Sequence, residues 1–390
     1  MVICDITQFY SETSGGIKTY LEAKGNYIAG SGKWKQVMIV PYKDDVIDEM
    51  PGRTVYKLKA YPFPWNRQYR LILNPAKCCR LLIKEKPDII EVGSPDMLSW
   101  IAIRYAKKHD IPCIGFYHSD YPDTYFQFAT KRDRFKRLAT FPHWLAWEYT
   151  KLLYNKFEVT LVASSGLKEK LLKNGIRNAH LVPLGVDTNI FTPDKKNSSL
   201  IKNLGLERGL STVLYIGRLS NDKCFGLFVD SVKALWVYRK TNCLIAGEGP
   251  LRGLALRFQK EFPEHVRYLG YVSKEMVAML YASSDVLLLP SKHETFGLAA
   301  LEGLASGIPV VYQKTYGFSD TLCNEAGFLV DDPCPKSFAS VVLKVLNIGV
   351  DNLGQKARDF VLTYYSWDKT FSELGKLYEF LVHKKGCSSN

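Results

Sequence analysis

The chain has 390 residues, more than one ordinary hydrophobic core supports, so we expect two domains. Hydrophobic residues make up 46% and charged residues 23%, a balance typical of soluble globular proteins. No run approaches the roughly 18 apolar residues of a membrane-spanning helix, and the opening MVICDITQFY lacks the pattern of a signal peptide. Nine cysteines without a CxxC pair predict reduced thiols, a cytoplasmic location and no zinc site.

Positive charge is concentrated in the first half. The formal net charge is +13, and residues 1–186 hold 28 Lys and Arg against 18 Asp and Glu, whereas residues 187–390 hold 24 against 21. Such asymmetry indicates an acidic partner, either anionic lipid, nucleic acid or a phosphorylated acceptor. The alternative is the general basicity of proteins encoded by a small or AT-rich genome.

Apolar runs alternate with helical periodicity in the first half. The pattern predicts strands at 2–6, 37–40, 54–58, 88–92, 112–117, 159–163 and 179–183, with helices at 76–84 and 97–108. This alternation favours an α/β fold with a doubly wound parallel sheet. Gly15 and Gly16 open a further helix after the first strand, where backbone can approach a phosphate or sugar closely. The pair is not a GxGxxG motif, so alone it indicates little.

His118 ends one predicted strand within the segment FYHSDYPDTYF. Together with Asp120 and the tyrosines at 117, 121 and 125, it lies where the carboxyl end of a parallel strand places ligand-binding groups. The alternative is an ordinary histidine in a surface loop.

The segment 130–157 mixes basic and aromatic residues. Its basic members are Lys131, Arg132, Arg134, Lys136 and Arg137, beside Phe135, Phe141, Trp144 and Trp147. This mixture fits a helix at a membrane surface, and no motif supports nucleic-acid binding. A core helix with a solvated basic end is the other interpretation.

The second half repeats the strand–helix pattern after a turn-rich stretch at 184–199, which we take as the linker. Strands are predicted at 213–216, 243–246, 266–272, 285–289 and 310–312, with helices at 225–239 and 274–283. Gly217, Arg218 and then Lys223 follow the first of these strands. Two cations at one strand exit suit a leaving diphosphate, whose negative charge grows as its bond to a sugar breaks.

The stretch PSKHETFGLAALEGLASGIP, residues 290–309, carries an acid at the mouth of a helix. Glu294 follows a buried strand, Gly297 opens the helix, and Glu302 lies about two turns further along it. Helix starts and the carboxyl ends of parallel strands are both sites where ligands bind. An acid that merely complements the helix dipole is the alternative.

The end of the chain predicts one amphipathic helix that packs back on the body. The stripe consists of Trp367, Phe371, Leu374, Leu377, Tyr378 and Leu381. We therefore expect a first domain at 1–184, a second at 185–365, and the helix 366–385 crossing back to the first.

At this point the motifs together resemble a known family. HETFGLAALE matches the E-x7-E motif of the retaining glycosyltransferases of family 4, and GRLSNDKCFG matches their Arg and Lys. GEGP, GFLV, SGGIKTYL and the YSWDKTFSELGKLYEFL segment look similar too. The resemblance covers nearly the whole chain and implies the GT-B architecture, with two facing Rossmann-like domains. It is strongest to the branch of mannosyltransferases and glycolipid glycosyltransferases.

The resemblance implies a role for each matched position. Arg218 and Lys223 would bind the diphosphate, Glu294 the hydroxyls of the transferred sugar, and His118 the sugar near its reacting carbon. The donor-binding positions would be Gly15, Gly16, Gly217, Gly249, Phe296, Gly297, Leu298 and Glu302. Among them, Glu302 would hold the ribose, the amides near Gly297 the phosphate and sugar, and Gly249 the base pocket. Cys224 stands where the family usually has glycine, and the segment 314–330 lacks a common glycine cluster.

The implied mechanism is a front-face substitution that needs no divalent metal and no cofactor. A double displacement would require a carboxylate nucleophile, and both matched acids are assigned to hydroxyl groups. Asp44 and Asp45 read as a turn rather than a metal motif.

We expect GDP-mannose as donor and a membrane glycolipid or glycan as acceptor, bound by the first domain. The five basic residues of 131–137 would then dock an anionic membrane, with peripheral attachment at its inner face. One alternative is a UDP-sugar-dependent glucosyl- or N-acetylglucosaminyltransferase with a soluble or polysaccharide acceptor. Another is a catalytically silent GT-B binding protein.

Overall fold

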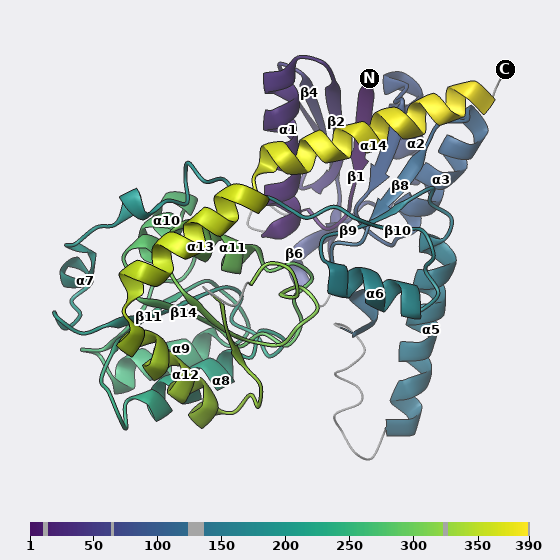
Figure 1. Ribbon diagram of the computed structural model, residues 1–390. Coiled ribbons are helices and arrows are strands. Elements are labelled where there is room, and N and C mark those ends of the chain that lie inside the picture. Colours follow the sequence, from purple (N-terminus) through teal and green to yellow (C-terminus); the bar gives the residue numbers. More distant parts are fainter. Residues whose placement is uncertain (11–14, 64–65, 124–135, 323–326, 389–390) are drawn as a thin grey trace. The chain divides into compact units, whose positions relative to one another are not determined.

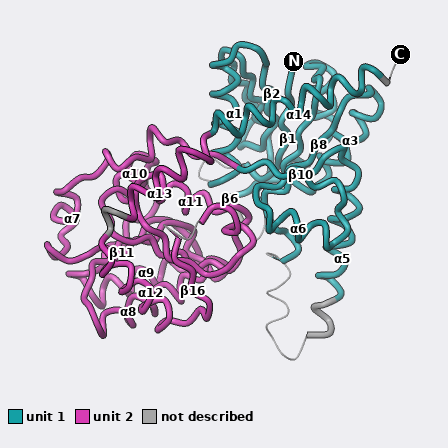
Figure 2. Tube along the Cα trace, in the orientation of Figure 1, with its two compact units in different colours: residues 1–183, 367–390 teal, residues 184–366 magenta. Residues whose placement is uncertain are grey.

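The structure is a computed structural model, and it describes residues 1–10, 15–63, 66–123, 136–322 and 327–388. The chain divides into two compact units (Figure 2). Unit 1 comprises residues 1–183 and 367–390, and unit 2 comprises residues 184–366. The stretch 184–199, which we predicted to be a linker, thus begins unit 2.

Unit 1 is built on an eight-stranded sheet of order β10-β9-β8-β7-β1-β2-β4-β3. Its strands are β1 (Val2–Ile6), β2 (Lys35–Tyr42), β3 (Val46–Met50), β4 (Arg53–Lys59), β7 (Ile89–Val92), β8 (Cys113–Phe116), β9 (Thr160–Val162) and β10 (Ala179–Leu181). All pairs are parallel except β3 with β4. The central strands β7 and β8 are buried at every residue, as expected of strands covered on both faces.

Two antiparallel pairs in unit 1 escaped the sequence prediction. They are the β3–β4 pair and the separate hairpin of β5 (Tyr61–Phe63) and β6 (Asn66–Leu71). β3 is an edge strand in which four of five residues are exposed, so it has no hydrophobic alternation to reveal it. Asp44 and Asp45 lie in the turn before it, as predicted.

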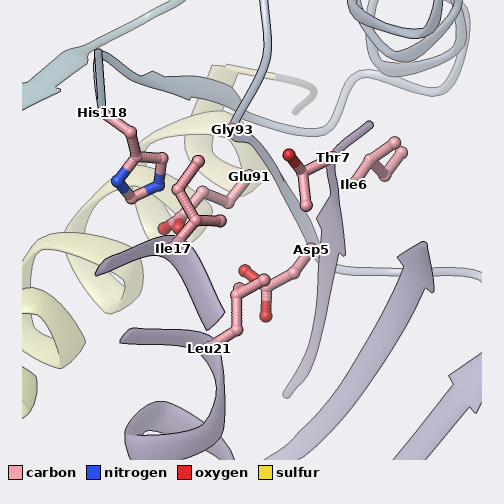
Figure 3. A pocket seen from close by; sticks show the side chains of 8 residues that line it. All are labelled: Asp5, Ile6, Thr7, Ile17, Leu21, Glu91, Gly93 and His118. Carbon is pink, nitrogen blue, oxygen red and sulfur yellow. The ribbon is translucent and has the colours of Figure 1, made fainter. Parts of the chain in front are cut away.

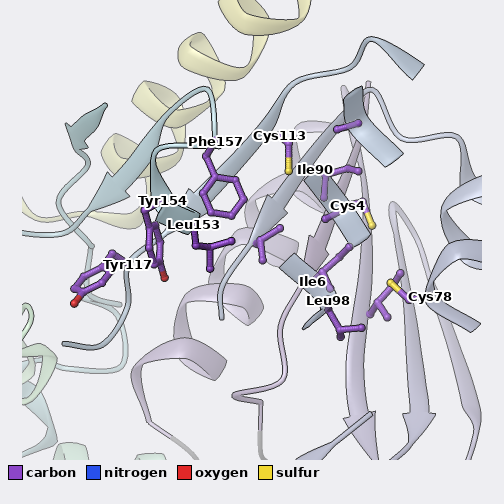
Figure 4. Packing of buried hydrophobic residues seen from close by; sticks show 14 of the residues in the cluster. Cys4, Ile6, Cys78, Ile90, Leu98, Cys113, Tyr117, Leu153, Tyr154 and Phe157 are labelled. Carbon is purple, nitrogen blue, oxygen red and sulfur yellow. The ribbon is translucent and has the colours of Figure 1, made fainter. Parts of the chain in front are cut away.

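The helices of unit 1 are α1 (Gly16–Ser31), α2 (Pro75–Glu85), α3 (Met97–His109), α5 (Lys136–Tyr154), α6 (Ser165–Lys173) and α14 (Trp367–Ser388). Polar caps fix two of their starts: the Asp96 carboxylate accepts from Leu98 N at 2.8 Å, and the Ser164 hydroxyl accepts from Leu167 N at 3.3 Å. The buried core of this unit joins strand residues to helix residues such as Leu98 and Leu153 (Figure 4).

The C-terminal helix α14 packs beside α1 (Figure 1). Its buried residues include Phe371, Leu374, Tyr378 and Leu381, which belong to the predicted stripe. Burying side chains of this size stabilises the packed helix by about 1.5–3 kcal/mol each. A helix from the end of the chain therefore belongs to the unit formed by its beginning.

Unit 2 is a six-stranded parallel sheet of order β13-β12-β11-β14-β15-β16. Its strands are β11 (Thr212–Ile216), β12 (Asn242–Ala246), β13 (Val266–Tyr268), β14 (Val286–Leu289), β15 (Val310–Gln313) and β16 (Gly327–Val330). Counted within the unit, this order is the 3-2-1-4-5-6 arrangement of a Rossmann fold. Successive strands are added on one side of β11 up to β13 and on the other side from β14 onward, so the crevice for a ligand is expected at the carboxyl ends of β11 and β14.

The helical elements of unit 2 are η2 (Pro193–Lys195), α7 (Leu200–Asn203), α8 (Phe225–Leu235), α9 (Arg252–Glu261), α10 (Lys274–Ala282), α11 (Leu298–Ala305), α12 (Pro335–Ile348) and α13 (Val350–Tyr364). Two predicted elements end four residues earlier than expected. β13 stops at Tyr268 because Gly270 turns the chain with a φ of 66°, and α8 stops at Leu235 rather than at Arg239.

Candidate active site

The loops that follow β11 and β12 are hydrogen-bonded to each other, and glycines allow their backbones to come close together. Gly217 N donates to Ala246 O at 3.1 Å, and Leu219 N donates to Glu248 O at 3.0 Å. A Cβ at Gly247 would lie 2.0 Å from Gly217 O, and one at Gly249 would lie 2.4 Å from Leu219 O. Because only glycine permits this approach, Gly247 and Gly249 have a structural reason to be glycine, whatever they bind. Gly217 has a different one, its positive φ of 152°.

Lys223 and Glu294 meet at the switch point of unit 2. Lys223 Nζ lies 2.6 Å from Glu294 Oε1, and the two side chains are 26% and 17% exposed. The structure therefore brings together two residues that are 71 positions apart and were assigned to one site from sequence. Arg218 follows β11 with an exposed side chain, and its carbonyl accepts a hydrogen bond from Tyr215 Oη at 2.8 Å.

Cys224, where the family usually has glycine, adopts a left-handed conformation with φ 52° and ψ 38°. This conformation costs a residue with a Cβ roughly 1–2 kcal/mol. Cys224 precedes α8 directly and follows Lys223, so the strain lies next to a candidate site residue. The departure from glycine has thus left the backbone in the conformation that glycine favours.

The turn from Glu294 to Leu298 leads into α11. Gly297 has a φ of 87°, and a Cβ there would lie 2.3 Å from Phe318 Cε1. The first N–H groups of a helix lack acceptors within the helix, so this turn can offer amides to an anion, as predicted for Phe296, Gly297 and Leu298. The side chain of Phe296 itself is buried.

Glu302 is a partly buried acid on α11. Burial raises the pKa of its carboxyl from 4.5 to about 7, although Lys274 and a hydrogen bond from Tyr281 oppose the shift. The Tyr281 hydroxyl lies 3.3 Å from Glu302 Oε2. Glu302 is therefore poised to change its charge near neutral pH.

In unit 1, a pocket lies at the corresponding switch point between β1 and β7 (Figure 3). It is lined by Asp5, Ile6, Thr7, Ile17, Leu21, Glu91, Gly93 and His118. The His118 ring stacks on Phe116 with a centroid distance of 4.0 Å. A Cβ at Gly93 would lie 3.3 Å from both His118 Cδ2 and Thr7, so glycine lets these groups come close together.

The imidazole of His118 is neutral. Burial first, and then the nearby charge of Lys24, lower its pKa from 6.5 to about 3. A neutral imidazole can donate and accept hydrogen bonds, but it does not supply positive charge. Gly15 precedes α1, is exposed, and a Cβ there would meet nothing within 4 Å. Unlike Gly247 and Gly249, Gly15 is therefore not required by the packing of its own unit.

A buried ionic cluster, which includes Asp5 and Glu91 of this pocket, was missed by the sequence reasoning. Lys24 Nζ lies 2.6 Å from Asp5 Oδ1 and 3.1 Å from Glu91 Oε2, and all three side chains are at most 3% exposed. The hydroxyls of Tyr20 and of Tyr378 from α14 both donate to Glu91. Burial raises the pKa of Asp5 to about 6, despite the opposing charge of Lys24. For Lys24, burial lowers the pKa, but the negative charges of Asp5 and Glu91 outweigh this effect, so its pKa is raised. The sequence did contain a signal for this cluster, because Asp5 and Glu91 each lie within an otherwise apolar strand.

Asp120, predicted to line the site, is instead a structural residue. Its carboxylate accepts from Lys170 and, at 3.1 Å, from the Tyr117 hydroxyl, and it is buried. Lys170 also binds Asp123, which lies 2.7 Å from His143 Nε2. This ion cluster fixes the segment after His118 to α5 and α6.

The predicted membrane segment is described only in part. Lys131, Arg132 and Arg134 lie outside the described residues, and the structure gives the backbone but not the side-chain surroundings of Lys136 and Arg137 at the start of α5. Further along α5, an exposed apolar stripe is formed by Phe141, Trp144, Leu145, Tyr149 and Leu152. Trp147 is not part of it: the ring is buried, with Lys170 Nζ 5.4 Å from its centroid.

The residues that the structure describes were searched for membrane-spanning helices, metal-binding groups and disulfides. Within them, no helix combines the length and hydropathy that crossing a membrane requires. No group of three or more His, Cys, Asp and Glu side chains converges there as metal ligands would. The eight cysteines in this part of the chain form no disulfide.

Similarity to curated proteins covers most of the chain. A GDP-mannose-dependent alpha-(1-6)-phosphatidylinositol dimannoside mannosyltransferase of Mycobacterium tuberculosis is 28% identical over 350 residues, which is 89% of this chain and 88% of that protein. A GDP-mannose-dependent alpha-mannosyltransferase of Corynebacterium glutamicum is 30% identical over 253 residues, 64% of this chain and 57% of that protein.

Solved structures establish the fold. Sucrose-phosphate synthase from Thermosynechococcus elongatus has a TM-score of 0.79 at 20% identity, covering 98% of this chain and 99% of that one. The catalytic domain of Starch Synthase IV from Arabidopsis thaliana has a TM-score of 0.73 at 15% identity, with coverage of 98% and 99%. The Glycosyltransferase Family 4 model matches residues 14–190, and the Glycosyl transferases group 1 model matches residues 197–360. The chain therefore belongs to glycosyltransferase family 4 and has the GT-B fold, which confirms the resemblance seen in its motifs.

Proposed function

We propose that this protein is a retaining glycosyltransferase that moves mannose from GDP-mannose to a membrane glycolipid or glycan. The observation that carries the proposal is the grouping of Arg218, Lys223 and Glu294 at the switch point of unit 2, where α11 begins. Two cations and a set of helix amides suit a diphosphate, and a carboxylate suits sugar hydroxyls. The relatives described above, named for their dependence on GDP-mannose, support the choice of donor.

In the proposed mechanism, the charge of the leaving diphosphate is stabilised by Arg218, Lys223 and the amides of Phe296, Gly297 and Leu298. Lys223 is already held 2.6 Å from Glu294, so donor binding has to divide this ion pair between phosphate and sugar. Glu294 then binds hydroxyls of mannose, and Glu302 binds the ribose. Gly249 lines the base pocket, and Gly15 and Gly16 allow close approach of backbone to the donor.

The substitution proceeds on the front face of the sugar, because no carboxylate is assigned to attack the reacting carbon. An oxygen of the leaving diphosphate takes the proton of the acceptor hydroxyl as that hydroxyl attacks. The neutral imidazole of His118 contacts the sugar near the reacting carbon and orients it. Since two cations supply the charge that a divalent metal would supply, we expect chelation by EDTA to leave the rate unchanged.

Donor profiling tests the proposal. The protein is incubated with GDP-mannose, UDP-glucose or UDP-N-acetylglucosamine and a lipid extract, and the transferred sugar and its anomeric configuration are determined. We expect α-mannose in the lipid fraction. Transfer from a UDP-sugar alone would support the alternative of a glucosyl- or N-acetylglucosaminyltransferase. No turnover of any donor would favour the silent binding protein, which Arg218, Lys223, Glu294, Glu302 and His118 argue against.

We further propose that α5 docks unit 1 on anionic lipid. The support is its exposed stripe, in which Phe141 is 62%, Trp144 55% and Leu145 52% exposed, directly after the basic run 131–137. Aromatic residues beside basic ones are typical of interfacial helices. Peripheral attachment of this kind would place the acceptor-binding unit at the membrane.

Liposome flotation tests docking separately from catalysis. We expect the wild type to float with vesicles containing phosphatidylglycerol at low salt. W144D/L145D should bind about a hundredfold more weakly, because two apolar side chains that enter the membrane together contribute about 3 kcal/mol. The control is V237D/Y238D, which changes residues of unit 2 that are 78% and 72% exposed. Equal loss in both variants, or no flotation of the wild type, would refute docking through α5.

A further inference from the structure

The Glu294–Leu298 turn is held from outside by the segment 313–321, which we call the bracing loop. Gln313 Nε2 donates to Pro290 O, at the end of β14. A Cβ at Gly317 would lie 2.6 Å from Glu294 C and from Phe296 N, so the two backbones are in contact there. Thr321 Oγ1 donates to Phe296 O at 3.3 Å. The conformation of the turn is thus fixed by a loop that follows the next strand, β15.

Tyr365 joins the bracing loop and the turn. Its hydroxyl donates to Asp320 O, in the bracing loop, and its ring lies 6.1 Å from the ring of Phe296. The residue is 7% exposed, and its ring also contacts Phe360 of α13 at 5.5 Å. One buried side chain therefore contacts both the loop and the turn that the loop braces.

The backbone of Tyr365 lies where the chain leaves unit 2. Tyr365 O accepts from Val186 N at 2.9 Å, and Val186 and Ser366 form a parallel bridge. Unit 2 begins at residue 184 and ends at residue 366. The segments by which the chain enters and leaves this unit are therefore bonded to each other at Tyr365.

We propose that Tyr365 is a positioning residue that ties the Glu294–Leu298 turn to the two segments connecting unit 2 with unit 1. A shift of these segments moves the ring and hydroxyl of Tyr365, and with them Asp320 and Phe296. Conversely, a diphosphate sugar that orders the turn restrains the connecting segments. This role rests on the proposed function insofar as the turn is the donor site.

Hydrogen–deuterium exchange of Y365F against Y364F tests the proposal without any ligand. Y365F keeps the ring and removes only the hydroxyl, while Tyr364 is its neighbour with an exposed ring. We expect Y365F to speed amide exchange in 294–298 and 314–322 by about fivefold, the effect of one lost hydrogen bond, with β11 and β12 unchanged. Y364F should match the wild type. Unchanged exchange at 294–298 in Y365F, or an equal increase throughout unit 2, would overturn the positioning role.

Binding and kinetics then connect this role to function. With GDP-mannose as the probe, Y365F should raise the donor KM several-fold and lower kcat less, whereas Y364F should change neither. If the wild type neither binds nor turns over GDP-mannose or a UDP-sugar, the proposed function fails, yet the exchange experiment still decides whether Tyr365 positions the turn. If the donor binds and the KM of Y365F equals that of the wild type, the positioning role is wrong and the proposed function stands.

Discussion

Unit 1 buries the charges at its switch point together with their partners, whereas unit 2 keeps the charges at its own switch point partly exposed. The side chains of Asp5, Lys24 and Glu91 are buried and form ion pairs with one another at the His118 pocket. In unit 2, Lys223 and Glu294 pair while still partly exposed, and Arg218 extends into solvent. Both groups lie at the switch point of a parallel sheet. The difference fits a structural role for the first group and, under the proposed function, an exchange of partners for a ligand in the second.

The largest effect is expected from removing the central cation of the buried cluster. K24M leaves two carboxylates in the core without their countercharge and should lower the free energy of unfolding by about 3–5 kcal/mol. Urea denaturation measures the loss. The control is K233M, whose lysine forms an exposed pair with Glu261 at 2.8 Å and should contribute at most about 1 kcal/mol. Similar losses in the two variants would remove the contrast between buried and exposed charge.

The next largest effect is expected in unit 2, on turnover rather than stability. E294A should lower kcat by about a hundredfold or more, because a contact to the sugar is lost in the transition state. E261A, which removes an exposed carboxylate elsewhere in the unit, should leave kcat unchanged. Steady-state kinetics with the donor identified by profiling measures both, and a normal kcat in E294A would deny Glu294 its assigned role.

The pH dependence of stability tests whether the pKa of Glu302 is raised in the folded protein. Its folded pKa of about 7 exceeds the ordinary 4.5, so the folded protein binds more protons between these values. Stability therefore decreases as pH rises through that window, by up to about 3 kcal/mol. E302Q should flatten this part of the profile, which also contains a contribution of the same sign from Asp5. Coincident profiles of E302Q and wild type from about pH 5 to about pH 8 would contradict the assignment.

The smallest effect concerns the strained residue beside Lys223. C224G should raise the free energy of unfolding by about 0.5–1 kcal/mol, because relief of left-handed strain outweighs the added entropy of the unfolded chain. K86G is the matched control in unit 1, since Lys86 ends α2 with a φ of 46°. Thermal denaturation measures both. If C224G gains stability but its turnover falls, while the turnover of K86G is unchanged, then the strained backbone at Cys224 contributes to catalysis.

Sequence alone predicted the parts of the fold, and the grouping within the candidate site, that depend on local pattern. Arg218, Lys223 and Glu294 could be placed because each follows an apolar strand, and parallel strands bring their carboxyl ends together. The cluster of Asp5, Lys24 and Glu91 could not, because its partners come from β1, α1 and β7 and are joined by Tyr378 from α14. Asp120 was misjudged for the same reason, since its partner Lys170 lies 50 residues away.

The bracing loop shows a second limit of sequence reasoning. Gly317 lies in the segment 314–330, which lacks the family's common glycine cluster, yet this glycine allows the contact with Glu294 and Phe296. A single glycine carries no periodicity, so only the packing of two loops reveals its purpose. The strand β3 was missed because its exposed, acidic sequence resembles a loop.

The proposed function requires that the cations of unit 2 bind a nucleoside diphosphate. Calorimetric titration of GDP into the wild type and into R218A/K223A measures this directly. Charge-assisted bonds contribute about 1.5–3 kcal/mol each, so the double variant should bind GDP at least about a hundredfold more weakly while keeping the stability of the wild type. Equal affinity of the two proteins for GDP would contradict the claim.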